Sequence, residues 1–462
     1  MSEPGSSQPE RAQRVESVLA ELAALRAGDL PVTGGTTWAY VYDSGSEAVR
    51  EVGARAYAEM LDVNALDPTA FPSVVALENS VVGTVASVLG GGVGTFTSGG
   101  TESCLLAVKA ARDARSDMDG PELVLPVTAH PSFHKAAHYL GLTVVTTPVD
   151  GNFRALAEPL AAAITDRTVL VVASAPSYPT GTVDPVPEIA AAAAARRVRC
   201  HVDACIGGWV LPFLPDPPPF DLSVPGVTSL SVDLHKYGYA PKGASVLLFA
   251  EPELRRQAWY AYAGWPGYPV INPTAQSAKS AGPLAAAWAV LRHVGLDGYR
   301  TFALAARDAL LRLAAGVSRV DGLRLLGVPD STLLAVAGSA EVDVFVVADE
   351  LRARGFYAQV QLSLGDVPAN LHFSAHAVSP STVDALVAAL GDAVAAARSR
   401  GPAVPADLSG VDLSTMDEQG FTGVLAAAGL DSMAAINATL DSLPPPAREQ
   451  ALRLFLSVLL TP

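Results

Sequence analysis

The chain has 462 residues, of which half are apolar and 17% are charged, and its formal net charge is −15. Such a long, apolar chain predicts two or three packed domains and excludes a disordered protein. The acidic balance argues against nucleic acid or an anionic membrane as the main partner, because both are bound through clustered lysine and arginine.

The first 75 residues are expected to form an N-terminal arm. Residues 10–27 carry apolar side chains at helical spacing, and a second helix is expected near 46–61. The N-terminus has no apolar run that would indicate a signal peptide. The chain has three cysteines, an odd and low number that is typical of a reducing compartment. We therefore expect a cytoplasmic protein.

The longest uncharged stretch is residues 79–101, which is long enough to cross a bilayer. It is rich in glycine, serine and threonine, and its end resembles a turn. We interpret it as a helix followed by a loop, so no membrane span is predicted.

Residues 76–295 alternate short apolar runs with helical segments and are expected to form the large domain. The runs lie at 123–127, 143–148, 168–175, 198–204, 229–233 and 244–249. This alternation predicts an α/β fold with a mainly parallel sheet covered by helices on both faces. The chemistry is expected in loops at the carboxyl ends of the strands.

Residues 296–462 are expected to form a smaller C-terminal domain. A long helix is predicted at 284–318, followed by an α+β unit with strands near 332–337, 356–362 and 370–375 and a helix at 381–399. Residues 343–347 fit either a strand or the start of a helix. A polar linker and further helical segments follow residue 400.

A glycine-rich segment, GGGVGTFTSGGTE, matches neither a Walker loop nor GxGxxG. It contains a turn, Gly99–Gly100–Thr101, at the start of a helix. Backbone N–H groups at a helix N-terminus can bind phosphate, and Thr101 adds a hydroxyl group. The alternative is simple helix capping by Thr101 or Ser98.

His130, His134 and His138 have the spacing that places side chains on one face of a helix, where they could hold zinc. No acidic residue or cysteine stands at a matching distance, and Lys135 lies alongside, so no metal site is predicted. His130 also precedes Pro131 between a strand and a helix, which is a typical position for a site residue.

Two charged residues follow apolar runs. Asp203 ends the strand in HVDAC, where a carboxylate is costly unless it is paired; the alternative is a capping role. Lys236, in SVDLHKYGYAPKG, follows the next strand. Burial should lower the pKa of such a lysine and leave a nucleophilic amine; the alternative is a surface lysine in a hairpin.

These features together indicate a pyridoxal phosphate site. A phosphate-binding helix start, a histidine that can stack on a ring, an acid for the pyridine nitrogen and a lysine that can carry the cofactor occur in one α/β domain.

The same segments resemble fold type I pyridoxal enzymes with the aminotransferase-like fold, and within them the sphingosine-1-phosphate lyase branch of the group II decarboxylases. The resemblance rests on TSGGTESCLLAVKAARD, AHPSFHKAAHYLG, PTGTVDPVPEIA, HVDACIGGW and SVDLHKYGYAPKG, which occur in this order within residues 40–300. It implies a mainly parallel seven-stranded sheet and a homodimer with shared active sites.

The resemblance also implies roles for individual residues. Lys236 is then the Schiff-base lysine, Asp203 the partner of the pyridine nitrogen, and His130 the residue stacked on the ring. The cofactor phosphate is expected near Gly100, Thr101 and His235. On the substrate side it implies Lys242, together with Tyr42, which the family brings in from the partner subunit.

Three positions depart from the lyase pattern. Asp67 stands where the lyases have a histidine, Thr422 stands where they have a tyrosine, and Lys279 replaces an arginine. If position 67 faces the substrate, its negative charge should repel a phosphate by roughly 4 kcal/mol at about 4 Å.

The predicted function is that of a carbon–carbon lyase acting through an external aldimine. Cleavage of the Cα–Cβ bond of a β-hydroxy amine would be retro-aldol chemistry, whereas loss of the carboxylate would make the protein an amino-acid decarboxylase. A non-catalytic relative is a third reading, against which the full set of Lys236, Asp203 and His130 argues.

Overall fold

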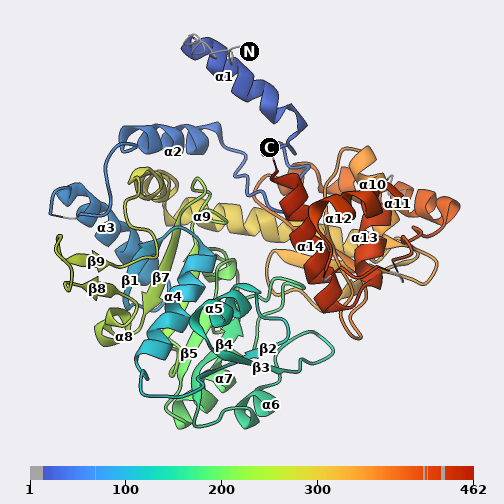
Figure 1. Ribbon diagram of the computed structural model, residues 1–462. Coiled ribbons are helices and arrows are strands. Elements are labelled where there is room, and N and C mark those ends of the chain that lie inside the picture. Colours follow the sequence, from blue (N-terminus) through green and yellow to red (C-terminus); the bar gives the residue numbers. More distant parts are fainter. Residues whose placement is uncertain (1–13, 68, 409–410, 414, 428–431, 462) are drawn as a thin grey trace, which may run out of the picture.

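The computed structural model describes residues 14–67, 69–408, 411–413, 415–427 and 432–461. The N-terminal region holds three helices, α1 (Val15–Leu25), α2 (Glu47–Glu59) and α3 (Pro72–Val88), with a short 3-10 turn (Arg26–Gly28) after the first. Helix α1 lies apart from the rest of the fold, and none of its side chains is buried (Figure 1).

A seven-stranded sheet forms the centre of the large domain, in the order β1-β7-β6-β5-β4-β2-β3. Strand β7 is antiparallel to both β1 and β6, and the other neighbours are parallel. The strands are β1 (Val93–Thr97), β2 (Glu122–Pro126), β3 (Thr143–Thr147), β4 (Thr168–Ser174), β5 (Arg199–Asp203), β6 (Ser229–Asp233) and β7 (Ser245–Phe249). The expected mainly parallel seven-stranded sheet is therefore confirmed.

Helices cover both faces of this sheet (Figure 1). One face packs against α3, α7 (Val186–Ala195) and the first half of α9, and the other packs against α4 (Gly100–Asp113) and α5 (Ser132–Leu140). Shorter elements complete the layers: α6 (Ala157–Ala162), α8 (Pro252–Arg256) and the 3-10 turns Gly207–Trp209 and Leu211–Phe213.

Strand β1 was not expected, because its segment was interpreted as a loop. Its backbone is paired along its length with β7, from Val93 with Phe249 to Thr97 with Ser245. Gly94 permits this close approach, since an added Cβ would lie 2.7 Å from the carbonyl oxygen of Leu247. The pairing with β7 thus stabilises a strand that the glycine-rich sequence does not predict.

Helix α9 (Gly282–Val317) joins the two domains and bends at Gly295, whose φ is 64°. Leu284 and Val290 in its first half pack into the large-domain core, and Leu310 and Leu313 in its second half pack into the core of the small domain. A hairpin of β8 (Tyr260–Tyr262) and β9 (Val270–Asn272) precedes it.

The small domain contains an antiparallel sheet in the order β10-β11-β13-β12. Residues 344–353 form a helix, so the segment 343–347 is the start of a helix and not a strand. Strand β10 was not expected. The elements are β10 (Leu323–Leu326), β11 (Leu333–Gly338), α10 (Val344–Ala353), β12 (Gln359–Gln361), β13 (Asn370–Ser374), the 3-10 turn Ser379–Ser381 and α11 (Val383–Arg400).

Three further helices, α12 (Glu418–Ala427), α13 (Met433–Ser442) and α14 (Pro445–Leu459), follow and pack around a small cluster of their own that includes Leu413, Phe421 and Leu454. None of the helices in the described ranges is both long enough and apolar enough to cross a membrane.

Candidate active site

A cavity of about 430 Å³ opens at the carboxyl ends of β4, β5 and β6. These strands end at Ser174, Asp203 and Asp233, and all three side chains line the cavity. The six residues expected to bind the cofactor also line it: Gly100, Thr101, His130, Asp203, His235 and Lys236. The fold therefore brings together residues that lie far apart in the sequence.

The N-terminus of α4 forms one wall of the cavity. A Cβ atom at Gly100 would lie 2.6 Å from Cys205 Sγ and 2.9 Å from both carboxylate oxygens of Asp233, so only glycine fits there. Glu102 fixes this turn, because its carboxylate accepts hydrogen bonds from the backbone N–H groups of Ser98 at 2.7 Å and Ala275 at 2.8 Å.

Lys236 forms an ion pair with Asp233, with Nζ 3.0 Å from Oδ2. Burial acts to lower the pKa of Lys236, but the carboxylate of Asp233, supported by Tyr42 and further groups, raises it well above its usual value. The expected lowering of this pKa was therefore wrong. The reason is the buried partner Asp233, which stands three residues before the lysine.

Asp233 is held by more than the lysine. Burial raises its pKa, but Lys236 and His235 outweigh this effect and leave the pKa low, and the Ser245 hydroxyl donates a hydrogen bond to it. His235 Nδ1 accepts a hydrogen bond from Ala244 N–H at 3.2 Å, and its Nε2 lies 3.6 Å from Asp233 Oδ2. Asp233 is thus ionised and organises both neighbours.

His130 lies between β2 and α5, before the helix begins at Ser132. Its Nδ1 lies 3.2 Å from the Ser132 N–H that donates to it, and its ring makes an edge contact with Tyr178, with centroids 6.4 Å apart. His134 and His138 are exposed on α5. The expected single helix face of three histidines is therefore wrong, because His130 precedes the helix.

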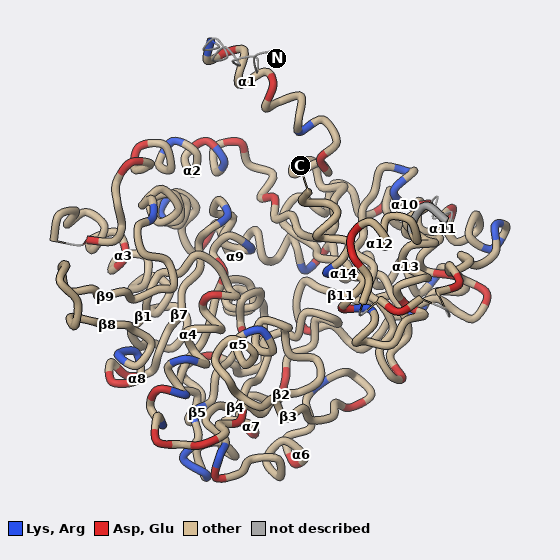
Figure 2. The backbone as a smooth tube through the Cα atoms, viewed as in Figure 1, with Lys and Arg blue, Asp and Glu red and all other residues tan. Residues whose placement is uncertain are grey.

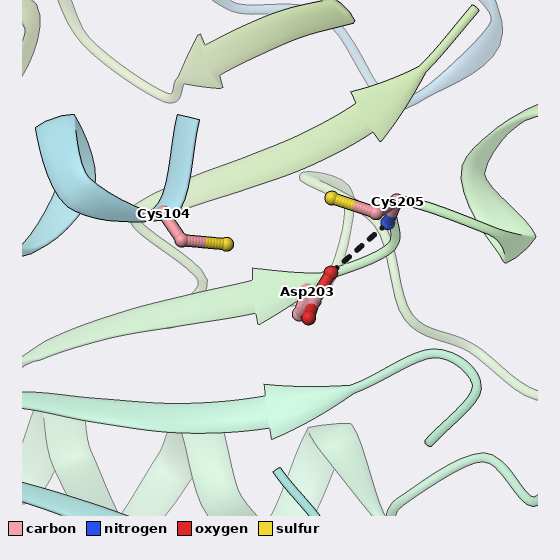
Figure 3. A group of neighbouring side chains, drawn as sticks. All are labelled: Cys104, Asp203 and Cys205. Carbon is pink, nitrogen blue, oxygen red and sulfur yellow. Dashed lines mark hydrogen bonds between the residues drawn. The ribbon is translucent and has the colours of Figure 1, made fainter. Parts of the chain in front are cut away.

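Asp203 ends β5 at the floor of the cavity. Its Oδ1 accepts hydrogen bonds from Cys205 N–H at 3.1 Å and from the Ser231 hydroxyl at 3.5 Å. Figure 3 shows the carboxylate beside the side chains of Cys104 and Cys205. Asp203 is 9% exposed, so the open side of its carboxylate faces the cavity that it lines.

Tyr42 and Lys242 lie beside the Lys236 end of the cavity. Lys242 Nζ lies 5.0 Å from the centre of the Tyr42 ring and donates to the carbonyl oxygen of His235 at 3.3 Å. The ring of Tyr42 packs against that of Tyr237. Burial raises the pKa of Tyr42, and the charge of Lys236 offsets only part of this effect. Tyr42 therefore lies near Lys236 of its own chain but lines neither cavity, and its supply by the partner subunit stays a prediction.

Lys242 lines a second cavity, of about 350 Å³, which shares Ser98 with the first. Lys279 lines this cavity too. Burial, with a contribution from Lys236, lowers the pKa of Lys242 to about 8. The two lysines give the second cavity cationic groups near the expected cofactor site.

The structure does not bring Asp67 to either cavity. Its carboxylate is exposed and accepts hydrogen bonds from the Thr69 hydroxyl at 2.6 Å, from Thr69 N–H at 2.8 Å and from Ala70 N–H at 3.3 Å. These bonds lower the pKa of Asp67. In this chain the residue stabilises its own turn.

Comparisons with known proteins place this geometry in a family. Residues 41–314, more than half of the chain, match the model of the pyridoxal-dependent decarboxylase conserved domain. The chain belongs to the pyridoxal-dependent decarboxylase family. A second model, described as a C-terminal putative HTH domain of pyridoxal-dependent enzymes, matches residues 402–458.

Relatives within this family include both lyases and decarboxylases. The chain is 37% identical over 358 residues to sphingosine-1-phosphate lyase of Oryza sativa subsp. japonica, which covers 74% of this chain and 66% of that protein. It is 33% identical to a probable L-tyrosine/L-aspartate decarboxylase of Methanothermobacter thermautotrophicus, over 66% of this chain and 85% of that protein. The chain thus spans less than two thirds of the rice lyase.

Solved structures of the family share the fold. The structure of Burkholderia pseudomallei sphingosine-1-phosphate lyase matches with a TM-score of 0.80 and 32% identity, over 86% of this chain and 94% of that one. A Lactobacillus brevis glutamate decarboxylase matches with a TM-score of 0.74 at 18% identity, which shows the fold alone. The aminotransferase-like fold type I prediction is therefore confirmed.

Pyridoxal 5'-phosphate is the cofactor of a pyridoxal-dependent decarboxylase, and the cavity fits it. The start of α4 offers free backbone N–H groups beside a position where a side chain cannot stand. The buried Ser174 hydroxyl lines the cavity and has no hydrogen-bond partner, as expected where a polar ligand binds. An acid, a histidine ring and a lysine amine complete the set that this cofactor requires.

Sequence reasoning missed several residues of this site. Asp233 ends β6 just as Asp203 ends β5, so the same strand-end signal was present in SVDLHK. Tyr178 lies on the loop after β4, where no motif marks it. Cys104 and Cys205 were treated only as a cysteine count, and no spacing rule connects a helix start with a strand end.

Proposed function

We propose that this chain is a pyridoxal phosphate-dependent carbon–carbon lyase that cleaves the Cα–Cβ bond of a β-hydroxy amine in a retro-aldol reaction, giving an aldehyde and a smaller amine. The similarity to sphingosine-1-phosphate lyases along most of the chain carries this proposal. Lys242 and Lys279 around the second cavity support a substrate with an anionic group such as a phosphate.

We propose the cofactor roles that the resemblance implies, which the meeting of these residues in the first cavity supports. Lys236 carries the cofactor, Asp203 partners the ring nitrogen and His130 stacks on the ring. Gly100 and Thr101 at the start of α4, with His235, hold the phosphate. When bound, the cofactor supplies a protonated pyridine ring that withdraws the electrons of the bond broken at Cα.

The remaining residues bind and orient the substrate. Lys236, which would hold the cofactor, would also be the group that returns a proton to Cα of the substrate. Tyr42 and Lys242 lie on the same side as Lys236 and would hold the substrate hydroxyl and anionic group. We do not expect Asp67 to repel a substrate phosphate, because its carboxylate accepts hydrogen bonds within its own turn.

Amino-acid decarboxylation is the alternative, favoured by the methanogen relative, of which this chain covers 85%. Incubation with phosphorylated and unphosphorylated β-hydroxy amines, and separately with amino acids, distinguishes the two. We expect an aldehyde from a phosphorylated β-hydroxy amine. Release of carbon dioxide from an amino acid, with no aldehyde from any amine, would refute the lyase assignment.

The assignment of Lys236 has its own test. Borohydride should bleach the yellow holoenzyme and leave a pyridoxyl group on the peptide that contains Lys236. The Lys236→Ala variant should stay colourless, whereas Lys135→Ala, which changes an exposed lysine on α5, should bind cofactor normally. A pyridoxyl group on another lysine would contradict the assignment.

The proposal also covers the oligomeric state of the protein, its location in the cell and its binding of nucleic acid. We infer a homodimer with shared active sites in the cytoplasm, which the three free cysteines support. We also infer that the HTH-like segment does not bind nucleic acid. Acidic side chains outnumber basic ones in residues 402–458, and Figure 2 shows acidic segments near α12 and α13. The basic residues are Arg448 and Arg453; the acidic ones are Asp407, Asp412, Asp417, Glu418, Asp431, Asp441 and Glu449.

A further inference from the structure

Two cysteines and one aspartate meet at the floor of the cofactor cavity. Cys104 lies in the first turns of α4, and Cys205 follows the end of β5 two residues after Asp203. The two Sγ atoms and a carboxylate oxygen of Asp203 all lie within 4.8 Å of one another. Figure 3 shows that the two thiol groups point toward each other across the end of β5.

The cluster is buried but lies at the wall of the cofactor cavity. Cys104 is 1% exposed and Cys205 is 8% exposed, yet both line the cavity. The Ser231 hydroxyl lies 3.3 Å from Cys205 Sγ and 3.5 Å from Asp203 Oδ1, so it connects two members of the cluster. Both cysteines are free thiols.

The residue types and spacing suit a thiophilic metal ion. Cysteine sulfur and carboxylate oxygen are both zinc ligands, and a Zn–S bond of about 2.3 Å places two sulfurs on one tetrahedral ion roughly 3.8 Å apart. The sulfurs here need to move little to reach that separation. The carboxylate of Asp233 and the sulfur of Cys205 both lie next to Gly100, so Asp233 adds negative potential that favours a cation. Water from the open cavity can supply the fourth ligand.

We propose that Cys104, Cys205 and Asp203 bind one thiophilic divalent cation, of the class of Zn²⁺ or Cd²⁺, in the cofactor-free chain, and that this cation excludes pyridoxal phosphate. Each thiol loses its proton as its metal–sulfur bond forms, so binding releases two protons and involves no change of oxidation state. The exclusion rests on the role given to Asp203 in the proposed function, since the ion and the ring nitrogen would compete for the side of this carboxylate that faces the cavity.

Among the residues that the structure describes, this is the one group of histidine, cysteine and acidic side chains with ligand atoms so close together. This cluster could not be predicted from the sequence, in which the spacing typical of metal ligands is that of the histidines in residues 130–138. The site arises only when the start of α4 is packed against the end of β5.

Metal binding can be tested with the full chain after hydroxylamine has removed the cofactor. Titration with Cd²⁺ alone should produce the ultraviolet sulfur-to-cadmium charge-transfer band and saturate at one ion per chain. Cys104→Ala and Cys205→Ala should each lose most of this band. Cys200→Ala is the matched control and should keep the band. Cys200 is buried in β5, the strand that ends at Asp203, but it does not belong to the cluster.

Competition can be tested by the order of addition. Chains loaded first with Cd²⁺ should fail to regain the cofactor absorbance with pyridoxal phosphate until a chelator is added. Holoenzyme should show no cadmium band, and cofactor-free Cys104→Ala should regain its cofactor colour in the presence of Cd²⁺. If Cys205→Ala fails to fold, Cys104→Ala decides the question, with circular dichroism as the check on folding.

Three results of the cadmium titrations would each overturn the proposal: a cadmium band of equal size in the Cys104→Ala variant, cadmium and cofactor bound together at one equivalent each, or no band at all. Loss of thiols that a reductant reverses but a chelator does not would also overturn it, because the pair would then be forming a disulfide. Since no substrate is used, a chain that proves not to be a lyase leaves this test intact.

Discussion

An added methyl group at residue 100 would meet the sulfur of Cys205 and the carboxylate of Asp233. Gly100→Ala should therefore lower the free energy of unfolding by about 1–3 kcal/mol and weaken cofactor binding, because the start of α4 must shift. Gly83→Ala is the matched control: Gly83 lies in α3 with no atom near its Cβ position, so alanine should stabilise by about 0.5–1 kcal/mol. Thermal unfolding and cofactor titration measure both effects; equal stability of the two variants would contradict the prediction.

The lowered pKa of Lys242 predicts a pH dependence of substrate binding. Burial brings this pKa to about 8, so the ammonium group is charged below pH 8 and loses its charge above it. The KM of a phosphorylated amine should therefore rise as the pH rises through 8. The same amine without phosphate is the control for titration of the substrate's own amino group.

Substitution of this lysine should remove that dependence. Lys242→Met should raise the KM of the phosphorylated amine at pH 7 about tenfold, which corresponds to about 1.4 kcal/mol, and should flatten its pH profile. Lys135→Met, on the exposed face of α5, should leave both unchanged. A KM that follows the same pH profile in wild type and Lys242→Met would show that Lys242 does not bind the phosphate.

At the scale of elements, Glu102 connects the start of α4 with the loop before α9 through its bonds to Ser98 and Ala275. Glu102→Ala should release this loop, and trypsin should then cleave after Lys279 several times faster than in wild type. Glu253→Ala is the control, because Glu253 pairs only with the exposed Arg256 on α8 in the described structure. Equal cleavage rates in Glu102→Ala and wild type would show that the loop is held by other contacts.

The strands that follow apolar runs could be predicted from the sequence, whereas β1 could not. Strands β4 to β6 are buried along almost their whole length, lie in or beside short apolar runs, and end at residues that line the site. Strand β1 contains glycine and threonine, and its stability comes from β7, far along the chain. Local patterns carry no information about such a distant partner.

The candidate site could be predicted in its residues but not in its electrostatics. The motifs identified Asp203, Lys236 and His130, which line one cavity. They did not show that Asp233 pairs with Lys236, or that the carboxylate of Asp67 turns toward Thr69. Both depend on side-chain directions, which a linear motif does not specify.

At the scale of the whole molecule, α1 presents an apolar stripe that no described part of the chain buries. Its residues Val15, Val18, Leu19, Leu22 and Leu25 are between 49% and 81% exposed. In the proposed homodimer this stripe should pack against the second copy, because an exposed apolar helix face is typical of an interface.

Replacing Leu19 and Leu22 together by glutamate should weaken that dimer. Each buried leucine contributes about 1.5–3 kcal/mol, so the dissociation constant should rise at least about 100-fold. Glu16→Gln with Glu21→Gln, a double change at charged positions of the same helix, should have little effect. Analytical ultracentrifugation measures both; a leucine variant that stays dimeric at the wild-type concentration would refute this role of α1.

The pairing of β1 with β7 has a consequence for the growing polypeptide. Every residue that lines the cofactor cavity has been synthesised once Lys236 is added, but β7, at Ser245–Phe249, has not. Until it emerges, β1 lacks the strand beside it in the sheet, and the turn that leads into α4 has no fixed support. A nascent chain that stops at Lys236 would thus contain the full set of cavity residues and still be unable to retain the cofactor.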